Sequence, residues 1–317
     1  MHKHGRTASG KQRWYCPECS VSAVQTRPDI TAQFRHTLFV KWLTGSRSLD
    51  EIAAEYGASR RTLIRWFKPL WAMPAPPSFP ARPQGSIYVL DGVYLSGREN
   101  VALICKAFPA AIRWSFAERE TAASWKGFLQ NLPHPAVVVI DGQKGLSKVI
   151  SQLWPEVKIQ RCLVHVERLA RIRLTRQPKS QAGKELLSLV HRLFDVQNGK
   201  QKRRWLALYR RWERRHDAFL IERSEGEPDP GKKRRWWYAH RNIRAARSLI
   251  RNALPNLFTY VGNPEIPRST NHVEGGINSR IKELIHRHRG LNDEQKRVLV
   301  ATFLGQIERE NPTRNVT

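Results

Sequence analysis

The sequence predicts an α/β fold in which an acidic residue directly follows a buried strand. Residues 136–140 are five consecutive apolar residues, a run typical of a parallel strand that is buried on both faces. Asp141 and Gly142 come next, residues 145–154 have apolar side chains at helical spacing, and residues 157–163 predict a second short strand. Ligands of open α/β sheets tend to bind at such carboxyl ends of strands. Taken alone, however, Asp141 is better explained as a turn and helix-cap residue.

The composition predicts a polyanionic partner. The chain has 317 residues, enough for two or three domains, with 55 Lys and Arg against 27 Asp and Glu, a net charge of +28 and a pI of about 10.8. Such a basic protein typically binds nucleic acid, and some of its eleven Trp residues are candidates to contact bases. Four Cys without a secretory signal indicate reduced thiols, and no apolar run approaches the ~18 residues of a membrane span. We therefore expect a cytoplasmic, nucleoid-associated protein without membrane contact.

Residues 1–28 contain half of a zinc-ribbon pattern. Cys16 and Cys19 form a Cys-x-x-Cys pair, but the second pair that completes a tetrahedral site is absent, and only His2 and His4 precede it. No helical pattern follows the pair, which disfavours a redox role. We interpret the segment as a partial zinc ribbon and expect little or no Zn²⁺ unless one of the two histidines completes the site.

Residues 29–72 predict a small helix-turn-helix domain. Ser48 and Glu51 form a capping-box pattern at the start of one short helix, and Ser59 caps the next. This second helix begins with basic residues, so we expect it to bind DNA through Arg60, Arg61 and Arg65. The alternative is an ordinary helical hairpin with a solvated basic face.

After a proline-rich linker at residues 73–85, residues 86–165 predict the first part of a ribonuclease-H-like domain with a mixed sheet. Three consecutive strands are followed by a helix and then by the buried strand that precedes Asp141. In this order the fourth strand lies beside the first and parallel to it. Asp91, inside the first strand, then neighbours Asp141. Two such acids repel each other unless a cation joins them.

Residues 166–261 predict an all-α, strongly basic insertion. Most of its Trp residues fit a helical core, whereas Trp236 and Trp237 directly follow four cations at residues 232–235 and are the candidates to touch DNA. We expect this stretch to begin the last helix of the insertion.

Residues 262–317 predict the helices that close the catalytic domain. Glu274 shares helical spacing with Ile277 and Ile281, which places it on the face that packs on the sheet rather than in solvent. The simpler alternative is a capping acid near a helix N-terminus.

Asp91, Asp141 and Glu274 together predict a metal-dependent phosphoryl-transfer site. Carboxylates that share two divalent cations can activate a water or a 3′-hydroxyl and stabilise the leaving oxygen of a phosphodiester. Mg²⁺, or Mn²⁺ in its place, suits oxygen ligands and phosphate substrates.

These motifs resemble those of bacterial insertion-sequence DDE transposases of the Mutator-like class, in the variant that carries an N-terminal zinc ribbon. The resemblance covers nearly the whole chain. It rests on the Val-Ile-Asp141-Gly strand end, on Arg-Cys-Leu-Val-His at residues 161–165 and on Thr-Asn-His-Val-Glu at residues 270–274.

The resemblance implies that Asp91, Asp141 and Glu274 form the DDE triad, with a helical insertion between the second Asp and the Glu. It also implies an enzyme that cuts at the ends of a mobile element and joins the 3′-hydroxyl to target DNA. Cys162 and His165 match a motif of this class, for which positioning near the site and simple packing of a buried thiol are alternatives.

We accordingly expect a protein that binds double-stranded DNA, both the terminal repeats and the target, and acts on it as a homodimer. Two other functions are compatible with the sequence. One is a related metal-dependent nuclease or resolvase that cuts without joining strands, and the other is a non-enzymatic helix-turn-helix regulator. Acids inside apolar elements argue against the regulator, because buried carboxylates are costly without a role.

Overall fold

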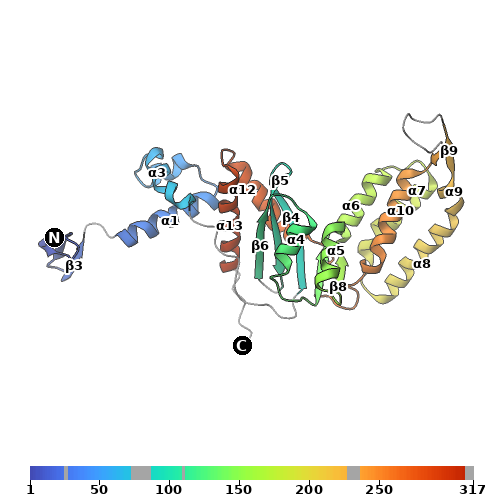
Figure 1. Cartoon of the computed structure of the whole chain (residues 1–317), viewed down its shortest axis with the longest axis horizontal. Coiled ribbons are helices and arrows are strands. Elements are labelled where there is room, and N and C mark those ends of the chain that lie inside the picture. The colour runs from blue at the N-terminus through green and yellow to red at the C-terminus, as the bar shows by residue number, and fades with distance from the viewer. Residues whose placement is uncertain (25–27, 73–86, 109–110, 227–235, 311–317) are drawn as a thin grey trace. The chain divides into compact units, whose positions relative to one another are not determined.

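The computed structural model describes residues 1–24, 28–72, 87–108, 111–226 and 236–310 (Figure 1). The predicted linker at residues 73–85 and the four cations at residues 232–235 lie outside these ranges. The chain divides into two compact units, the first formed by Met1–Pro76 with Leu284–Phe303 and the second by Pro77–Glu283 with Leu304–Thr317. In the described part of the chain, no helix has the length and apolar character needed to cross a membrane.

The first unit begins with a small antiparallel sheet in the order β1-β2-β3, formed by β1 (His2–Arg6), β2 (Gln12–Cys16) and β3 (Val21–Val24). Three helices follow: α1 (Pro28–Thr44), α2 (Leu49–Glu55) and α3 (Arg60–Trp71). The predicted caps are confirmed. Ser48 and Glu51 make the reciprocal capping-box bonds at the start of α2, and the Ser59 side chain accepts a hydrogen bond from the Thr62 backbone N–H at the start of α3.

Aromatic packing holds these helices together. Trp42 of α1 stacks on Phe67 of α3 with their ring centroids 5.4 Å apart. The C-terminal part of this unit joins the same cluster, because the His288 ring meets Trp42 edge-on at 4.8 Å and its Nε2 lies 3.0 Å from the Leu43 carbonyl oxygen. Residues far apart in sequence therefore share one core.

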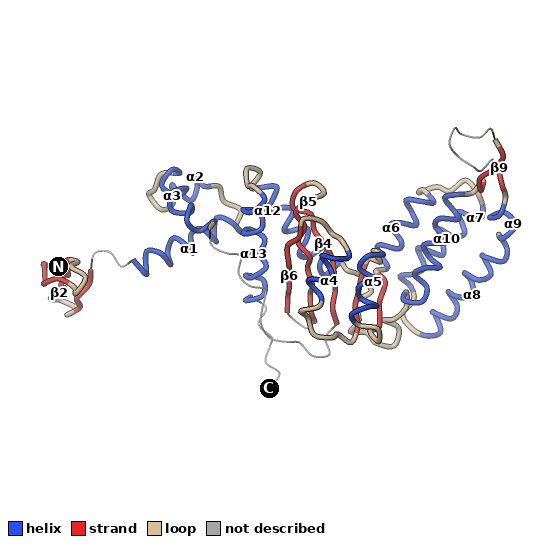
Figure 2. Tube along the Cα trace, viewed as in Figure 1, coloured by secondary structure: helices blue, strands red, loops and turns tan. Residues whose placement is uncertain are grey.

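The second unit contains a five-stranded mixed sheet in the order β6-β5-β4-β7-β8 (Figure 2). Its strands are β4 (Ile87–Ser96), β5 (Glu99–Ala107), β6 (Ala111–Ala117), β7 (Val137–Ile140) and β8 (Lys158–Arg161). The first three are antiparallel neighbours, and β4, β7 and β8 are parallel. The predicted mixed α/β class is confirmed, and β7 lies beside β4 as expected. The last strand ends at Arg161, two residues earlier than predicted, because residue 163 already begins a helix.

Two helices, α4 (Ala122–Leu129) and α5 (Lys144–Leu153), cover one face of this sheet (Figure 1). Trp125 and Leu129 from α4 and Ile150 from α5 are fully buried against the sheet residues Tyr88 and Val138. On the opposite face, the short helix α11 (Asn271–Val273) contacts β4 and β5. Both faces of β4 are thus covered, which explains why most of its residues are apolar, and all four residues of β7 are buried.

The insertion is mostly helical, and its long helices lie side by side in Figure 1. They are α6 (Leu163–Leu174), α7 (Gln181–His191), α8 (Gly199–Arg215), α9 (Asp217–Ile221) and α10 (Arg241–Ala253), with short 3₁₀ turns η1 (Arg192–Asp195) and η2 (Leu254–Asn256). Trp205 and Trp212 of α8 are buried, and their indole N–H groups donate to the carbonyls of Leu189 and Ala182. The prediction that most Trp residues here belong to the core is confirmed for this pair.

One prediction for the insertion is wrong: the segment at Trp236 does not begin a helix, and the insertion is not all-α. Trp236–Tyr238 forms strand β10, which pairs antiparallel with β9 (Arg223–Glu225). Three consecutive aromatic residues favour a strand, where large side chains pack on alternate faces. The last helix, α10, begins only at Arg241.

The chain closes with α11, a π-helical turn η3 (Glu274–Asn278), α12 (Ser279–Arg287) and α13 (Asp293–Glu310). Glu274 therefore lies on a widened turn rather than on a regular α-helix. Ile277 and Ile281 are buried as the helical spacing predicted.

Candidate active site

The pairing of β4 with β7 brings Asp91 and Asp141 to neighbouring positions. Val89 on β4 is aligned with Val139 on β7. Each Asp comes two residues later on its own strand, so the same register carries both to one end of the parallel pair. Asp141 stands where β7 stops, and its Oδ1 accepts a hydrogen bond from the Gln143 backbone N–H at 2.8 Å. Asp141 is thus a turn residue as predicted, but it is not the cap of α5 (Lys144–Leu153), whose N-cap position is occupied by Gln143.

Glu274 approaches this region from the π-helical turn. Its Oε2 lies 3.7 Å from Nδ1 of His165, and its Oε1 lies 3.6 Å from Nη1 of Arg168, both on α6. The side chain is 31% exposed, so it is not turned fully into the core as the α-helical spacing predicted. The π-turn changes the direction of residues at its start relative to a regular helix, which explains the difference.

Asp141 and Glu274 both lie within electrostatic range of Asp91. The pKa of Asp91 is raised to about 7, first by burial and then by the charges of Asp141 and Glu274, while His165 and the Gly92 backbone N–H oppose the shift. We name Asp91, Asp141 and Glu274 the acid cluster. Within the described ranges, however, no three His, Cys, Asp or Glu side chains are close enough together to hold a metal ion as they stand.

Cys162 and His165 tie the helix of Glu274 to the start of α6. Cys162 caps α6, its Sγ lies 3.3 Å from Nδ1 of His165, and it accepts a hydrogen bond from the Thr270 backbone N–H at 3.3 Å. The Leu163 N–H also donates to the Arg268 carbonyl at 2.9 Å. These bonds fix the chain just before Glu274, which favours positioning over simple packing.

The same contact makes a cation beside the acid cluster. The hydrogen bond to Cys162 raises the pKa of His165 to about 9; burial opposes this, and the charges of Cys162, Glu274 and Asp141 support it. Burial raises the pKa of the Cys162 thiol, but hydrogen bonds from His165 and Thr270 outweigh it and the net pKa is lowered. His165 is therefore an imidazolium ion at neutral pH.

Arg161 and Gly142 form a close contact that the sequence did not reveal. The Arg161 guanidinium occupies the space beside Gly142, where an added Cβ would lie 1.7 Å from its central carbon, and Gly142 has a φ of +90°. Nη2 of Arg161 donates to the Asp141 carbonyl at 3.0 Å. The absence of a side chain at Gly142 thus lets an arginine support the loop that carries Asp141.

Sequence reasoning also missed two neighbours of the acid cluster. Asn278 is 3% exposed, and its Nδ2 donates to Oδ2 of Asp91 at 2.7 Å. Glu120 places its carboxylate against Gly92, where an added Cβ would lie 2.9 Å from it, and accepts a hydrogen bond from the Trp125 indole at 3.1 Å. Burial and the charge of Asp141 raise the pKa of Glu120, and the Trp125 hydrogen bond opposes them. Glu120 precedes a helix cap in a polar stretch, so nothing in its local sequence distinguishes it.

The predicted DNA-binding arginines lie at the start and middle of α3. Arg61 and Arg65 are exposed. Arg60 is exposed too, but its Nη1 pairs with Asp50 of α2 at 3.1 Å. Two of the three arginines thus present their charge to solvent in the way that a phosphate or base contact requires.

In the β9–β10 hairpin, the aromatic candidates are held by cations. Arg223 lies over the Trp236 ring at 4.0 Å, and Arg241 lies over the Trp237 ring at 5.5 Å. Trp237 is 39% exposed, so it is the better placed of the two to meet a partner.

The Cys-x-x-Cys pair of the predicted partial zinc ribbon lies at the end of β2 and in the turn after it. Cys16 ends β2, and Cys19 is exposed in the turn. Hydrogen bonds from Cys19 and the Glu18 backbone lower the pKa of Cys16. His2 and His4 lie on β1 with their rings 5.5 and 5.2 Å from that of Tyr15. A lowered thiol pKa favours metal binding, but two thiols alone leave a tetrahedral site incomplete.

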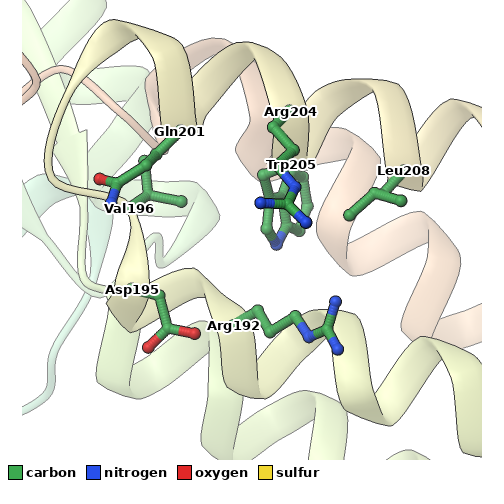
Figure 3. A pocket seen from close by; sticks show the side chains of 7 residues that line it. All are labelled: Arg192, Asp195, Val196, Gln201, Arg204, Trp205 and Leu208. Atoms are coloured by element: carbon green, nitrogen blue, oxygen red, sulfur yellow. The ribbon is translucent and has the colours of Figure 1, made fainter.

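The insertion carries a basic groove between η1 and α8 that sequence analysis did not identify. A cavity of about 420 Å³ opens there, and the guanidinium groups of Arg192 and Arg204 both reach into it (Figure 3). Its other lining residues are Asp195, Val196, Gln201, Trp205 and Leu208. In the sequence, each arginine of a basic helix is most simply explained as a solvent-exposed residue. Only the fold shows that the Arg192 and Arg204 side chains approach the same cavity.

Comparison with known proteins supports the motif resemblance. Residues 110–220 match the family model described as transposase, Mutator family. A stretch of 98 residues is 34% identical to the transposase for insertion sequence element IS905 of Lactococcus lactis subsp. lactis (strain IL1403). That alignment spans 26% of this chain and 25% of the relative's length. The resemblance to Mutator-like insertion-sequence transposases is confirmed.

Proposed function

We propose that this relative of the Mutator-like insertion-sequence transposases is itself a DDE transposase with a ribonuclease-H-like catalytic domain. It would bind the terminal repeats of an insertion sequence, cut the DNA at the element ends and join the 3′-hydroxyl to target DNA. The proposal is supported by the strand register, which brings Asp91 and Asp141 to one end of the β4–β7 pair, and by the charge of Glu274, which acts on Asp91 although the three acids are 50 and 133 residues apart in sequence.

The donor set of the acid cluster fits a hard divalent cation. Carboxylate oxygens are the ligands that Mg²⁺ and Mn²⁺ prefer. Burial first and the charges of Asp141 and Glu274 second raise the pKa of Asp91, and a bound cation would relieve that repulsion. Asp91, Asp141 and Glu274 would hold the ions. When bound, such ions supply Lewis-acid activation of a water or 3′-hydroxyl and charge stabilisation at the leaving oxygen.

The protein's own groups prepare this site. Arg161 supports the loop of Asp141 through the backbone carbonyl, and Cys162 fixes the chain ahead of Glu274 through Thr270. The His165 imidazolium partly neutralises Glu274 while the acids are close together. These contacts keep the acids near their working positions, which lowers the reorganisation needed for reaction.

DNA is the partner that the charge distribution favours. The net charge of +28 extends through both units, and the exposed arginines Arg61 and Arg65 of α3 suit a helix-turn-helix reader. The basic groove at Arg192 and Arg204 suits backbone phosphates. Trp237, beside Arg241, suits an unstacked base. We further propose that the protein acts as a homodimer on paired element ends, which light scattering of the DNA complex can test.

The test uses the full chain with labelled element-end DNA and a target plasmid in Mg²⁺. We expect Asp141→Asn and Glu274→Gln each to abolish cleavage and joining while DNA binding stays near wild type, because neither substitution removes one of the basic residues proposed to bind DNA. Glu283→Gln is the matched control on the neighbouring helix α12 and is expected to keep activity.

The product pattern separates the alternatives. Joined products support a transposase, nicks without joining indicate a nuclease or resolvase, and binding without either indicates a regulator. Wild-type joining by Glu274→Gln would remove Glu274 from the proposed triad.

A further inference from the structure

Asn278 is the polar residue in closest contact with Asp91, and half of its amide group is unused. Its Nδ2 donates to Oδ2 of Asp91 at 2.7 Å. Its Oδ1 is buried and has no hydrogen-bond partner among the residues that the structure describes. Buried amide oxygens are rarely left without a donor. The orphaned oxygen therefore marks a place where a ligand group is expected.

Another buried amide in the same unit shows what a purely structural role looks like. Gln160 is fully buried, and both ends of its amide are used: Nε2 donates to the carbonyls of Arg161 and Leu257, and Oε1 accepts from the Tyr260 backbone N–H. Asn278 has only its nitrogen bonded, to an acid of the proposed site. Gln160 thus has the hydrogen bonds of a purely structural core residue, whereas Asn278 has a spare acceptor next to the proposed site.

Two further buried polar atoms without a partner lie at residues of the same region. In the part of the chain that the structure describes, five such side-chain atoms occur, and three belong to Gln143, Arg161 and Asn278. Gln143 bonds to Asp141 through its backbone, and Arg161 bonds to the carbonyl of Asp141. Unpaired groups thus gather around the two aspartates rather than being spread through the core.

The backbone around Asn278 has the form that functional sites often use. Glu274 and Asn278 are the first and last residues of the π-helical turn. Single π-helical turns are rare and frequent at functional sites. One turn of chain therefore carries both an acid of the cluster and the amide that contacts Asp91.

We infer that Asn278 is a positioning residue of the acid cluster, whose amide nitrogen holds Asp91 and whose amide oxygen helps to hold a divalent cation or its water. The inference rests on the proposed function. While the Asp91 carboxyl group is ionised it can only accept hydrogen bonds, so Nδ2 of Asn278 must face it and Oδ1 must face away. A neutral oxygen donor there adds a ligand for the cation without adding a fourth negative charge to three that already repel.

The test measures Mn²⁺ binding by electron paramagnetic resonance on the full chain without DNA. We expect Asn278→Ala to weaken Mn²⁺ affinity by roughly 10- to 100-fold, the range for groups that orient metal ligands. Gln160→Ala, the matched control, is expected to lower the melting temperature but leave Mn²⁺ affinity at the wild-type value. Asn278→Leu keeps the shape of the side chain but lacks both polar atoms of the amide, so we expect it to lose Mn²⁺ affinity to the same extent.

The outcomes distinguish this inference from the proposed function. If Asp91→Asn loses Mn²⁺ binding while Asn278→Ala binds like wild type, the role of Asn278 is refuted and the acid cluster stands. If Asp91→Asn binds Mn²⁺ like wild type, the acid cluster itself is refuted as a metal site. Should Asn278→Ala fail to fold, Asn278→Leu decides: a folded Leu variant that binds Mn²⁺ like wild type overturns the inference.

Discussion

Replacing Asp91 by Asn should stabilise the metal-free protein at neutral and alkaline pH. Asp91 is buried beside Asp141 and Glu274, and its pKa of about 7 is well above the ordinary value of 3.8. The amide removes the charge but keeps an oxygen that can still accept the hydrogen bond from Asn278. The variant therefore relieves repulsion without leaving Asn278 unpaired.

The size of the effect follows from the pKa. One pKa unit corresponds to about 1.4 kcal/mol. The difference between 3.8 and about 7 then corresponds to about 4 kcal/mol of destabilisation by the ionised group. Because the folded-state pKa lies above that of the unfolded chain, this destabilisation is absent below about pH 4, grows towards pH 7 and is complete above it. Solvent reaches part of the half-buried side chain, so we expect a gain of about 2–4 kcal/mol at pH 8.

Hydrogen exchange of the β4 and β7 amides in EDTA measures this free energy for the second unit alone. Glu156→Gln, an exposed acid before β8, is the control and should change little at any pH. We expect the gain of Asp91→Asn to shrink as the pH falls to 5, and added Mn²⁺ to stabilise wild type more than the variant. A variant less stable than wild type at pH 8 in EDTA would refute the reasoning, because the carboxylate would then be favoured in the folded protein.

Three further predictions concern the DNA-binding helix, the N-terminal cysteines and the loop of Asp141. Arg61→Ala and Arg65→Ala should each weaken binding to terminal-repeat DNA by about 1–3 kcal/mol if the side chain contacts a base. Fluorescence anisotropy at two salt concentrations measures this affinity, and unchanged affinity for both variants would exclude α3 as the helix that reads the DNA sequence. Zinc analysis of the purified protein should find little metal, and stoichiometric zinc that disappears with Cys16→Ser would contradict this. Gly142→Ala should destabilise the second unit by about 1–2 kcal/mol or more, since the positive φ is strained for alanine and the Cβ collides with Arg161, and an unchanged melting temperature would rule out that contact.

The sheet was predictable because its signals are local and repeated. The unbroken apolar run of β7 and the apolar residues on either side of Asp91 in β4 reflect burial, and short connections restrict how successive strands can pair. The caps Ser48 and Ser59 were equally readable, since a cap depends on only three or four residues. The β9–β10 hairpin was not readable, because three aromatic residues next to a helical pattern fit either structure until their partner strand is known.

The sequence indicated residues of the candidate site only where an acid lies within or directly after an apolar strand. Asp91 and Asp141 interrupt or end buried strands, so each needs a physical reason. Asn278 and Glu120 occur in polar surroundings where an amide or acid is unremarkable. Their importance comes from contacts with Asp91 and Gly92, residues 187 and 28 positions away. Such long-range contacts leave no periodic signal in a single sequence.

The fold also connects parts of the site that the family match does not cover. The matched residues 110–220 include Asp141, Cys162 and His165 but neither Asp91 nor Glu274. Asp91 joins the matched region through the strand pairing of β4 with β7, and the segment before Glu274 joins it through the bonds of Thr270 to Cys162. The Leu163 N–H also bonds to the Arg268 carbonyl, and Glu274 lies beside His165 and Arg168. We expect a change at Cys162 to loosen the segment that carries Glu274, because it removes the hydrogen bonds from Thr270. The Cys-x-x-His motif is thus better understood as a physical link between the start of α6 and the segment before Glu274 than as simple packing.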